Sequence, residues 1–253
     1  MFKKFHPVDS AQGAHFASGG NALLLKQLLP APTGAHPGRE IVHGDTRYTH
    51  STLCERIGRL ATSLERLGVA SGETVAVMDW DGHRYLEAAF AVPMMGAVLM
   101  TVDVWLSPEQ VAYSLNHSGA RTLLVHADFL PLLRQIRPEL ETVDSFIVIA
   151  DGAALEIPPG FVGEYERLLE AAAPDFEFPD LDENGTAITF YAIGTAGKPR
   201  GASFSHRQLV LHTLACKSAL GGSPAPRHAH RDEVYMPTLL QMLLVSAEQA
   251  VAP

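Results

Sequence analysis

Residues 74–102, TVAVMDWDGHRYLEAAFAVPMMGAVLMTV, contain three regular patterns in succession. The apolar residues of 74–78 alternate as in a strand, and those of 83–95 have helical spacing that ends at Gly96. A second short apolar run follows at 97–102. Strand, helix and strand in this order are typical of a protein whose helices connect neighbouring parallel strands.

Upstream of this unit the sequence predicts a hairpin and a helix. A Gly-Asp turn divides residues 41–48 into two short apolar pieces, which is a weak hairpin signal. Helical spacing then extends over residues 53–67. Thr52 and Glu55 are predicted to form its capping box, and Gly68 is placed as its C-terminal glycine.

Downstream the alternation of strands and helices continues. Ser107, Pro108 and Gln110 supply the N-cap, the first helical position and the third, so a helix is expected from there to about Ser118. Further strands are predicted at 122–125, 146–149 and 187–191, and further helices at 129–136 and 164–173. The sequence therefore predicts an α/β fold with mostly parallel sheets covered by helices.

The distribution of proline, glycine and acidic residues predicts the domain organisation. Residues 1–39 form a lead-in that ends in a Pro/Gly-rich loop, and residues 40–180 form one α/β subdomain. The acidic segment PDFEFPDLDE, residues 174–183, is the candidate linker. Residues 181–253 are predicted to begin a second α/β subdomain.

Composition limits the classes of partner. The chain has 253 residues, 28 acidic against 19 basic, a formal net charge of −9 and no Lys/Arg-rich block, so binding to nucleic acid is not expected. Cys54 and Cys216 form no CxxC pair, which argues against a disulfide framework or a zinc site. The apolar stretch 88–102 is interrupted and too short for a transmembrane segment. No signal-peptide pattern opens the sequence, so we expect a cytoplasmic protein that acts on small molecules.

A glycine-rich stretch, residues 191–206 (YAIGTAGKPRGASFSH), is the candidate functional site. Gly194, Gly197 and Gly201 lie between a predicted strand and a helix predicted to start near residue 205, and ligands of open α/β sheets bind at such places. Glycine backbone can form an anion-binding nest, and Arg200 adds positive charge, so phosphate is the expected ligand. The loop is neither a Walker A loop nor a dinucleotide fingerprint, and by spacing alone a plain connection is the more common alternative.

The same stretch resembles the phosphate-binding loop of adenylate-forming enzymes, [YF]-T-S-G-T-T-G-x-P-K-G-V-x-x-[ST]-H. The matching residues are Tyr191, Gly194, Thr195, Gly197, Pro199, Gly201, Ser205 and His206. Residues 47–102 and 106–125 are similar to the opening region of that family as well. The wording MDWDGHRYLEA and VPMMGAVL is most similar to the bacterial fatty-acid or medium-chain acyl-CoA ligase branch.

This resemblance implies an AMP-forming acid–CoA ligase. Such an enzyme adenylates a carboxylic acid, here a fatty acid, with ATP and Mg2+, releases pyrophosphate and transfers the acyl group to coenzyme A. The loop would hold the β- and γ-phosphates, and the residues expected to bind the nucleotide are Gly194, Thr195, Gly197, Arg200 and Gly201. No catalytic residue and no metal ligand is assigned.

Several donor positions of the loop depart from the family pattern. Ala192 and Ile193 replace the Thr-Ser pair, Ala196 replaces a threonine, and Arg200 replaces a lysine. Each lost hydrogen bond to a charged phosphate is expected to cost about 1.5–3 kcal/mol. Thr195 alone keeps a loop hydroxyl before Ser203. The loop is therefore expected to indicate the family more securely than it indicates catalytic activity.

The similarity ends after Pro237, where the text reads TLLQMLLVSAEQAVAP. The later elements of the family are absent, so an incomplete, N-terminal part of the adenylate-forming fold, inactive alone, is expected from a truncated or frameshifted gene. Two alternatives remain open: a non-catalytic remnant that binds a nucleotide or a partner, and an interaction protein with no nucleotide site.

Two other groups of residues are given no role. His228 and His230 lie in a polar loop without a third metal ligand nearby, so they are expected to be solvated. Asp79 and Asp81 lie where a strand ends and a helix begins, the usual place for caps and turns.

Overall fold

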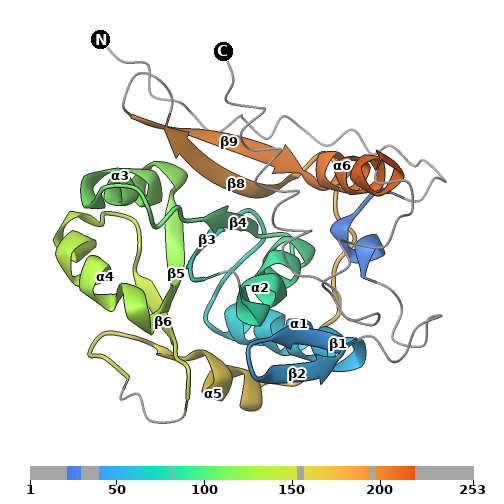
Figure 1. The fold of residues 1–253 in the computed structure, drawn as a ribbon, viewed down its shortest axis with the longest axis horizontal. Helices are drawn as coiled ribbons and strands as arrows, with labels where there is room; N and C mark the ends of the chain where they lie inside the picture. Colours follow the sequence, from blue (N-terminus) through green and yellow to red (C-terminus); the bar gives the residue numbers. More distant parts are fainter. Residues whose placement is uncertain (1–21, 30–39, 81, 153–156, 194–197, 220–253) are drawn as a thin grey trace.

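A seven-stranded sheet forms the centre of the molecule in the computed structural model, which describes residues 22–29, 40–80, 82–152, 157–193 and 198–219 (Figure 1). The strand order is β7-β6-β5-β3-β4-β8-β9. The strands are β3 (Thr74–Met78), β4 (Val98–Thr101), β5 (Ala120–His126), β6 (Ser145–Ile149), β7 (Gly163–Glu164), β8 (Thr186–Ile193) and β9 (Pro199–Ser205). All neighbouring pairs are parallel except β8 and β9, which confirms the predicted α/β fold with a mostly parallel sheet.

Helices cover both faces of this sheet. Helices α1 (His50–Arg66), α2 (His83–Met94) and α5 (Tyr165–Glu170) share one core, and α3 (Pro108–Ser118) and α4 (Leu130–Ile136) share the other. The remaining elements are the hairpin β1 (Glu40–His43) and β2 (Thr46–Thr49), the short 3-10 helices η1 (Leu25–Leu28), η2 (Ala127–Phe129) and η3 (Arg137–Glu139), and α6 (His206–Ala219). The predicted hairpin at 41–48 is confirmed.

Strand β3 shows how the sequence divides its side chains between the two cores. Val75 and Val77 pack in the core with α1 and α2, whereas Ala76 and Met78 pack in the core with α3 and α4. All four are fully buried. Both faces of a parallel sheet are covered, so its strands are apolar on both sides.

Helix starts test the capping predictions. Ser107 and Gln110 form the predicted capping box at the start of α3. The box predicted for Thr52 and Glu55 is wrong, because α1 begins at His50 and Thr49 is its N-cap, with its hydroxyl accepting from the Thr52 amide. A Ser/Thr-x-x-Glu pattern that lies inside a helix matches the sequence of a capping box. It cannot act as one, because the backbone N–H groups there are already bonded within the helix.

The sheet continues across the predicted subdomain boundary at residue 180. Strand β8 pairs in parallel with β4, and Leu99 lies opposite Ile188. The described strands before and after the boundary therefore belong to one sheet, and the division into 40–180 and 181–253 stays a prediction.

Strands β3 and β5 are neighbours whose following helices lie on opposite faces of the sheet. Helix α2 follows β3 and packs in one core, and α4 follows β5 and packs in the other. The carboxyl ends of such a strand pair open between the two helix layers. Side chains at this edge of the sheet therefore form a second candidate site.

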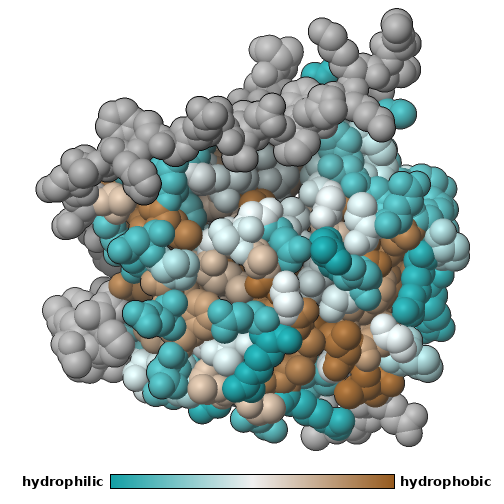
Figure 2. Space-filling view, turned by 180° about the vertical axis from the view of Figure 1, so that it is seen from behind, coloured by the Kyte–Doolittle hydropathy of each residue, from teal (hydrophilic) through white to brown (hydrophobic). Residues whose placement is uncertain are grey.

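The surface is mixed in polarity. Figure 2 shows hydrophobic areas separated by hydrophilic ones on one face of the molecule. Trp105 is the most exposed of the large apolar side chains in the described residues, at 85%. None of the helices in the described part of the chain has the length and hydropathy to span a membrane.

Candidate functional site

The glycine-rich stretch forms the end of an antiparallel hairpin. Tyr191 lies opposite Gly201, Ala192 opposite Arg200, and Ile193 opposite Pro199. Of the predicted nucleotide-binding residues, Arg200 and Gly201 lie on β9, where both are exposed. Gly194, Thr195 and Gly197 lie outside the described residues, as do Ala196 and Asp81.

The predicted connection from strand directly to helix is wrong. A second strand, β9, follows the loop, and helix α6 begins only at His206. The chain forms β9 because it can satisfy its backbone N–H and C=O groups along β8, while Phe204 stacks on Phe190 with ring centroids 5.6 Å apart. Arg200 and Gly201 are therefore strand residues, and their position depends on the ladder rather than on a helix N-terminus.

Gly201 has a packing reason to be glycine. A Cβ atom added there would lie 3.1 Å from the ring of Tyr191, its cross-strand partner. The backbone of β9 approaches that ring more closely than other residues allow. Gly201 is thus explained by close approach, whether or not a phosphate binds beside it.

Two cations lie on this hairpin. Arg200 is exposed and makes no ion pair with another residue in the described part of the chain. Lys198, which precedes β9, lies over the ring of Tyr113 on α3, with its Nζ 5.7 Å from the ring centroid. Lys198 was not among the predicted nucleotide-binding residues, although the Lys-Pro-Arg sequence shows two cations two residues apart.

Two hydroxyl groups in the described part of the hairpin lie further from its tip. Thr189 and Ser203 face each other across the strands, with 2.9 Å between their side-chain oxygens. Nearer the tip, Ala192 and Ile193 offer no side-chain donor, and Ile193 is 48% exposed. Among the described residues next to the tip, the hairpin therefore presents the positive charges of Lys198 and Arg200, while Ala192 and Ile193 add no side-chain donor.

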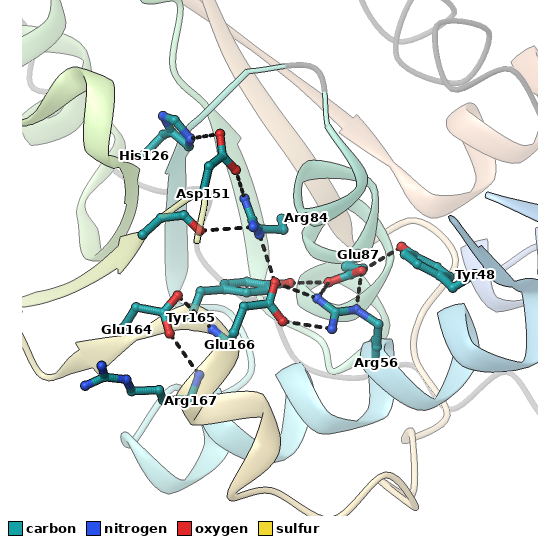
Figure 3. A network of polar contacts seen from close by, with 11 residues as sticks. Tyr48, Arg56, Arg84, Glu87, His126, Asp151, Glu164, Tyr165, Glu166 and Arg167 are labelled. Carbon is teal, nitrogen blue, oxygen red and sulfur yellow. Dashed lines mark hydrogen bonds and ion pairs between the residues drawn. The ribbon is translucent and has the colours of Figure 1, made fainter. Parts of the chain in front are cut away.

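A second polar cluster lies at the carboxyl edge of the parallel strands. His126 ends β5, and its Nε2 lies 3.2 Å from Asp151 Oδ2 beyond β6 (Figure 3). A hydrogen bond from Arg84 lowers the pKa of Asp151. Asp79 follows β3, and burial raises its pKa to about 6 although the nearby His126 opposes the shift. Asp79 was predicted only as a cap or turn residue, and its side chain does accept from the Trp80 amide.

This cluster continues into a partly buried network of charges between α1, α2 and α5 (Figure 3). Arg84 Nε binds Glu166 at 2.9 Å, and Arg56 binds both Glu166 at 2.8 Å and Glu87 at 2.6 Å. Burial alone would raise the pKa of Glu166, but hydrogen bonds from the two arginines lower it. Each charge is paired, so the network fits a structural role in joining the helices.

Glu87 is the centre of that network and is fully buried. The hydroxyl groups of Tyr48 and Tyr165 each donate to it at 2.7 Å, in addition to Arg56. Burial, followed by the charge of Glu87, raises the pKa of Tyr165. One signal for this residue was present in the sequence, because Glu87 is a glutamate inside the apolar helical stretch 83–95.

The described residues form no metal site of their own. No three His, Cys, Asp or Glu side chains come together as ligands in the part of the chain that the structure describes. His228 and His230, which were expected to be solvated, lie outside that part.

Comparisons with known proteins place the chain in a family, and the matched region includes the β8–β9 hairpin. The family model described as AMP-binding enzyme matches residues 31–243. The long-chain-fatty-acid–CoA ligase of Thermus thermophilus is 43% identical over 169 residues, which cover 67% of this chain and 30% of that protein. The 3-methylmercaptopropionyl-CoA ligase of Ruegeria lacuscaerulensis is 34% identical over 200 residues, 76% of this chain and 37% of that one.

Solved structures show the same fold. The anthranilate CoA ligase AuaEII, in complex with anthranoyl-AMP, superposes with a TM-score of 0.68 at 23% identity, over 80% of this chain and 37% of that one. This chain thus spans about a third of the length of these proteins, and it corresponds to their N-terminal part. With the family model matching most of its length and the hairpin in place, the chain belongs to the AMP-binding enzyme family.

Proposed function

We propose that this chain is the front portion of an AMP-forming acid–CoA ligase that activates a fatty acid. The observation that carries the proposal is the match to the AMP-binding family over residues 31–243, which includes the β8–β9 hairpin. The curated relatives include ligases for long-chain and medium-chain fatty acids. In the reaction ATP would adenylate the carboxylate, and coenzyme A would then take the acyl group.

Within that reaction we assign the hairpin to the triphosphate of ATP. Arg200 and Lys198 supply positive charge near the tip, and Gly194, Thr195, Gly197 and Gly201 are the other proposed contacts. Positioning and charge neutralisation contribute most of the catalysis in phosphoryl chemistry, so the cations matter more than any proton-transfer group. The charges of Arg200 and Lys198 would attract a triphosphate, and Mg2+ would enter the site together with it.

We further propose that the chain on its own has no turnover. It spans about a third of the length of its relatives, and Ala192 and Ile193 place no donors where the family pattern has hydroxyls. The alternative function is a non-catalytic remnant that binds a nucleotide or a partner. Such a remnant would bind an anion through the exposed Arg200, which makes no ion pair with another residue in the described part of the chain.

The test combines exchange and binding. The isolated chain is expected to show no ATP–pyrophosphate exchange with any fatty acid, and clear exchange would contradict the proposed inactivity. Mg-ATP at millimolar concentration is expected to raise the melting temperature, and Arg200→Ala should abolish the shift. If Mg-ATP leaves the melting temperature of the wild type unchanged, the proposal that the hairpin binds the triphosphate of ATP is wrong.

A further inference from the structure

Helix α3 contacts both strands of the hairpin through two side chains one helical turn apart. His117 Nδ1 lies 2.8 Å from the hydroxyl oxygen of Tyr191 on β8. Tyr113 lies beneath Lys198, which leads into β9. The rings of Tyr113 and His117 are 5.4 Å apart, so the two contacts form one continuous patch (Figure 1 shows α3 beside the hairpin).

Tyr191 links this patch to the backbone of the opposite strand. Its ring is buried and lies against Gly201, where a Cβ would come within 3.1 Å. Burial and the charge of Tyr113 raise the pKa of Tyr191 to about 12, so the phenol that shares a hydrogen bond with His117 is uncharged at neutral pH. Holding Tyr191 therefore holds the backbone at Gly201, next to Arg200.

Lys198 and Arg200 differ in what fixes them. The ring of Tyr113 attracts the ammonium group of Lys198 toward α3. Arg200 has no ion pair in the described part of the chain, and its backbone position is set by the pairing with Ala192. Arg200 is therefore the cation whose placement depends on how firmly the hairpin is held.

We propose that Tyr113 and His117 of α3 are positioning residues that fix the β8–β9 hairpin, and with it Arg200, for binding a triphosphate. This inference rests on the function proposed above. Tyr113 and His117 are both exposed, whereas Val111 and Leu115 of the same helix are fully buried. Replacing the two outer side chains leaves the core of α3 in place, so the variants are expected to fold.

The first measurement is hydrogen–deuterium exchange of the full chain without ligand. His117→Ala and Tyr191→Phe each remove the hydrogen bond between helix and hairpin, and amides of 189–193 and 200–203 should exchange about fivefold faster. His117→Asn keeps a hydrogen-bonding atom near the place of Nδ1 and should restore the wild-type rate. Glu109→Gln, an exposed change on the same helix, is the matched control and should leave the hairpin unchanged.

The second measurement is binding of Mg-tripolyphosphate by calorimetry. His117→Ala should raise the dissociation constant about fivefold. The reason is that the hairpin in this variant lacks the hydrogen bond that holds it against α3 in the wild type. His117→Asn should bind as the wild type does. A variant that was merely less stable would lose exchange protection throughout the sheet, including β5, and the asparagine would give no specific rescue.

Each outcome has one meaning. Unchanged hairpin exchange in His117→Ala would overturn the inference, and so would faster exchange with an unchanged dissociation constant. If the wild type binds neither Mg-tripolyphosphate nor Mg-ATP, the proposed function fails. In that case the exchange data alone decide whether α3 holds the hairpin, and faster exchange with asparagine rescue supports it.

Discussion

Asp79 is a single carboxyl group whose surroundings oppose its charge. It follows β3 at the edge where His126 and Asp151 also lie, and burial is the main cause of its raised pKa of about 6. The usual value in an unfolded chain is 3.8. The folded protein therefore binds a proton more tightly at this position than the unfolded chain does.

The sign of the resulting pH dependence follows directly. Between about pH 4 and pH 6 the native Asp79 holds its proton while the unfolded one has released it, so this group's contribution to stability is lost as pH rises through that window. Asp79→Asn removes the ionisation and keeps an acceptor for the Trp80 amide. We expect the variant to match the wild type below pH 4 and to exceed its unfolding free energy by about 3 kcal/mol at pH 7.

Urea denaturation at several pH values measures this difference. The exposed Asp175→Asn gives the baseline for replacing a carboxylate in water. A variant that is less stable than the wild type at pH 7 would show that Asp79 is stabilised by a partner instead of being strained by burial.

Glu87, unlike Asp79, is a buried carboxylate that three side chains share as their hydrogen-bond acceptor. Glu87→Ala leaves Arg56 and the hydroxyls of Tyr48 and Tyr165 without their shared acceptor. Removing one member of a buried ion pair costs about 3–5 kcal/mol, and chemical denaturation should show a loss of this size. Arg121→Ala breaks exposed pairs with Glu73 and Asp144 and should cost about 1 kcal/mol or less. Equal losses in the two variants would contradict the role given to the network.

At the scale of elements, α1 depends on one close approach to the segment after α5. A Cβ added at Gly58 would clash with the carbonyl oxygen of Pro174, because the two atoms would lie much closer than their van der Waals contact distance. Glycine in a helix normally costs about 1 kcal/mol relative to alanine, so Gly58→Ala would stabilise α1 if space allowed.

We expect the reverse sign. Gly58→Ala should lower the unfolding free energy by about 2 kcal/mol, since α1 or the 174–176 backbone must move. Glu55→Ala, on the exposed side of the same helix, should change stability by less than about 0.5 kcal/mol. A more stable Gly58→Ala protein in thermal melts would show that the segment yields freely.

Two features with a local signal were predicted correctly, whereas β9 and the charge network, which depend on other elements, were not. The Ser107 box at α3 and the hairpin at 41–48 depend on neighbouring residues. Strand β9 contains Pro199 and Gly201, two residues that disfavour strands, and it forms because β8 supplies the ladder and Phe190 the stacking surface. The charge network was missed for the same reason, since Arg56 and Glu166 are far apart in sequence.

At the scale of the whole molecule, the sheet joins the two predicted subdomains. Strand β8 lies against β4, and its residues Ala187 and Ile188 share a core with Val75 and Leu99. A phosphate site could be predicted from the sequence because its motif is contiguous, yet the setting of Arg200 and Gly201 in a hairpin depends on this larger sheet.

The shared sheet predicts a single unfolding transition. Trp80 and Trp105 report on the part before residue 180, and far-ultraviolet circular dichroism reports on all elements. We expect both signals to change at the same denaturant concentration, because separating β8 from β4 would expose a common core. An earlier loss of protection at β8 and β9, seen by hydrogen exchange in mild denaturant, would instead support two independent subdomains.

The place of β8 beside β4 has a consequence for synthesis. Strand β4 leaves the ribosome with one edge unpaired, and its partner emerges roughly 90 residues later, which takes about 5–20 s at ordinary rates of translation. During that interval the apolar edge of β4 is open to other nascent chains. Slowing translation before residue 186 should therefore lengthen the time for which chaperones must shield this edge, and it should lower the yield of folded protein in cells.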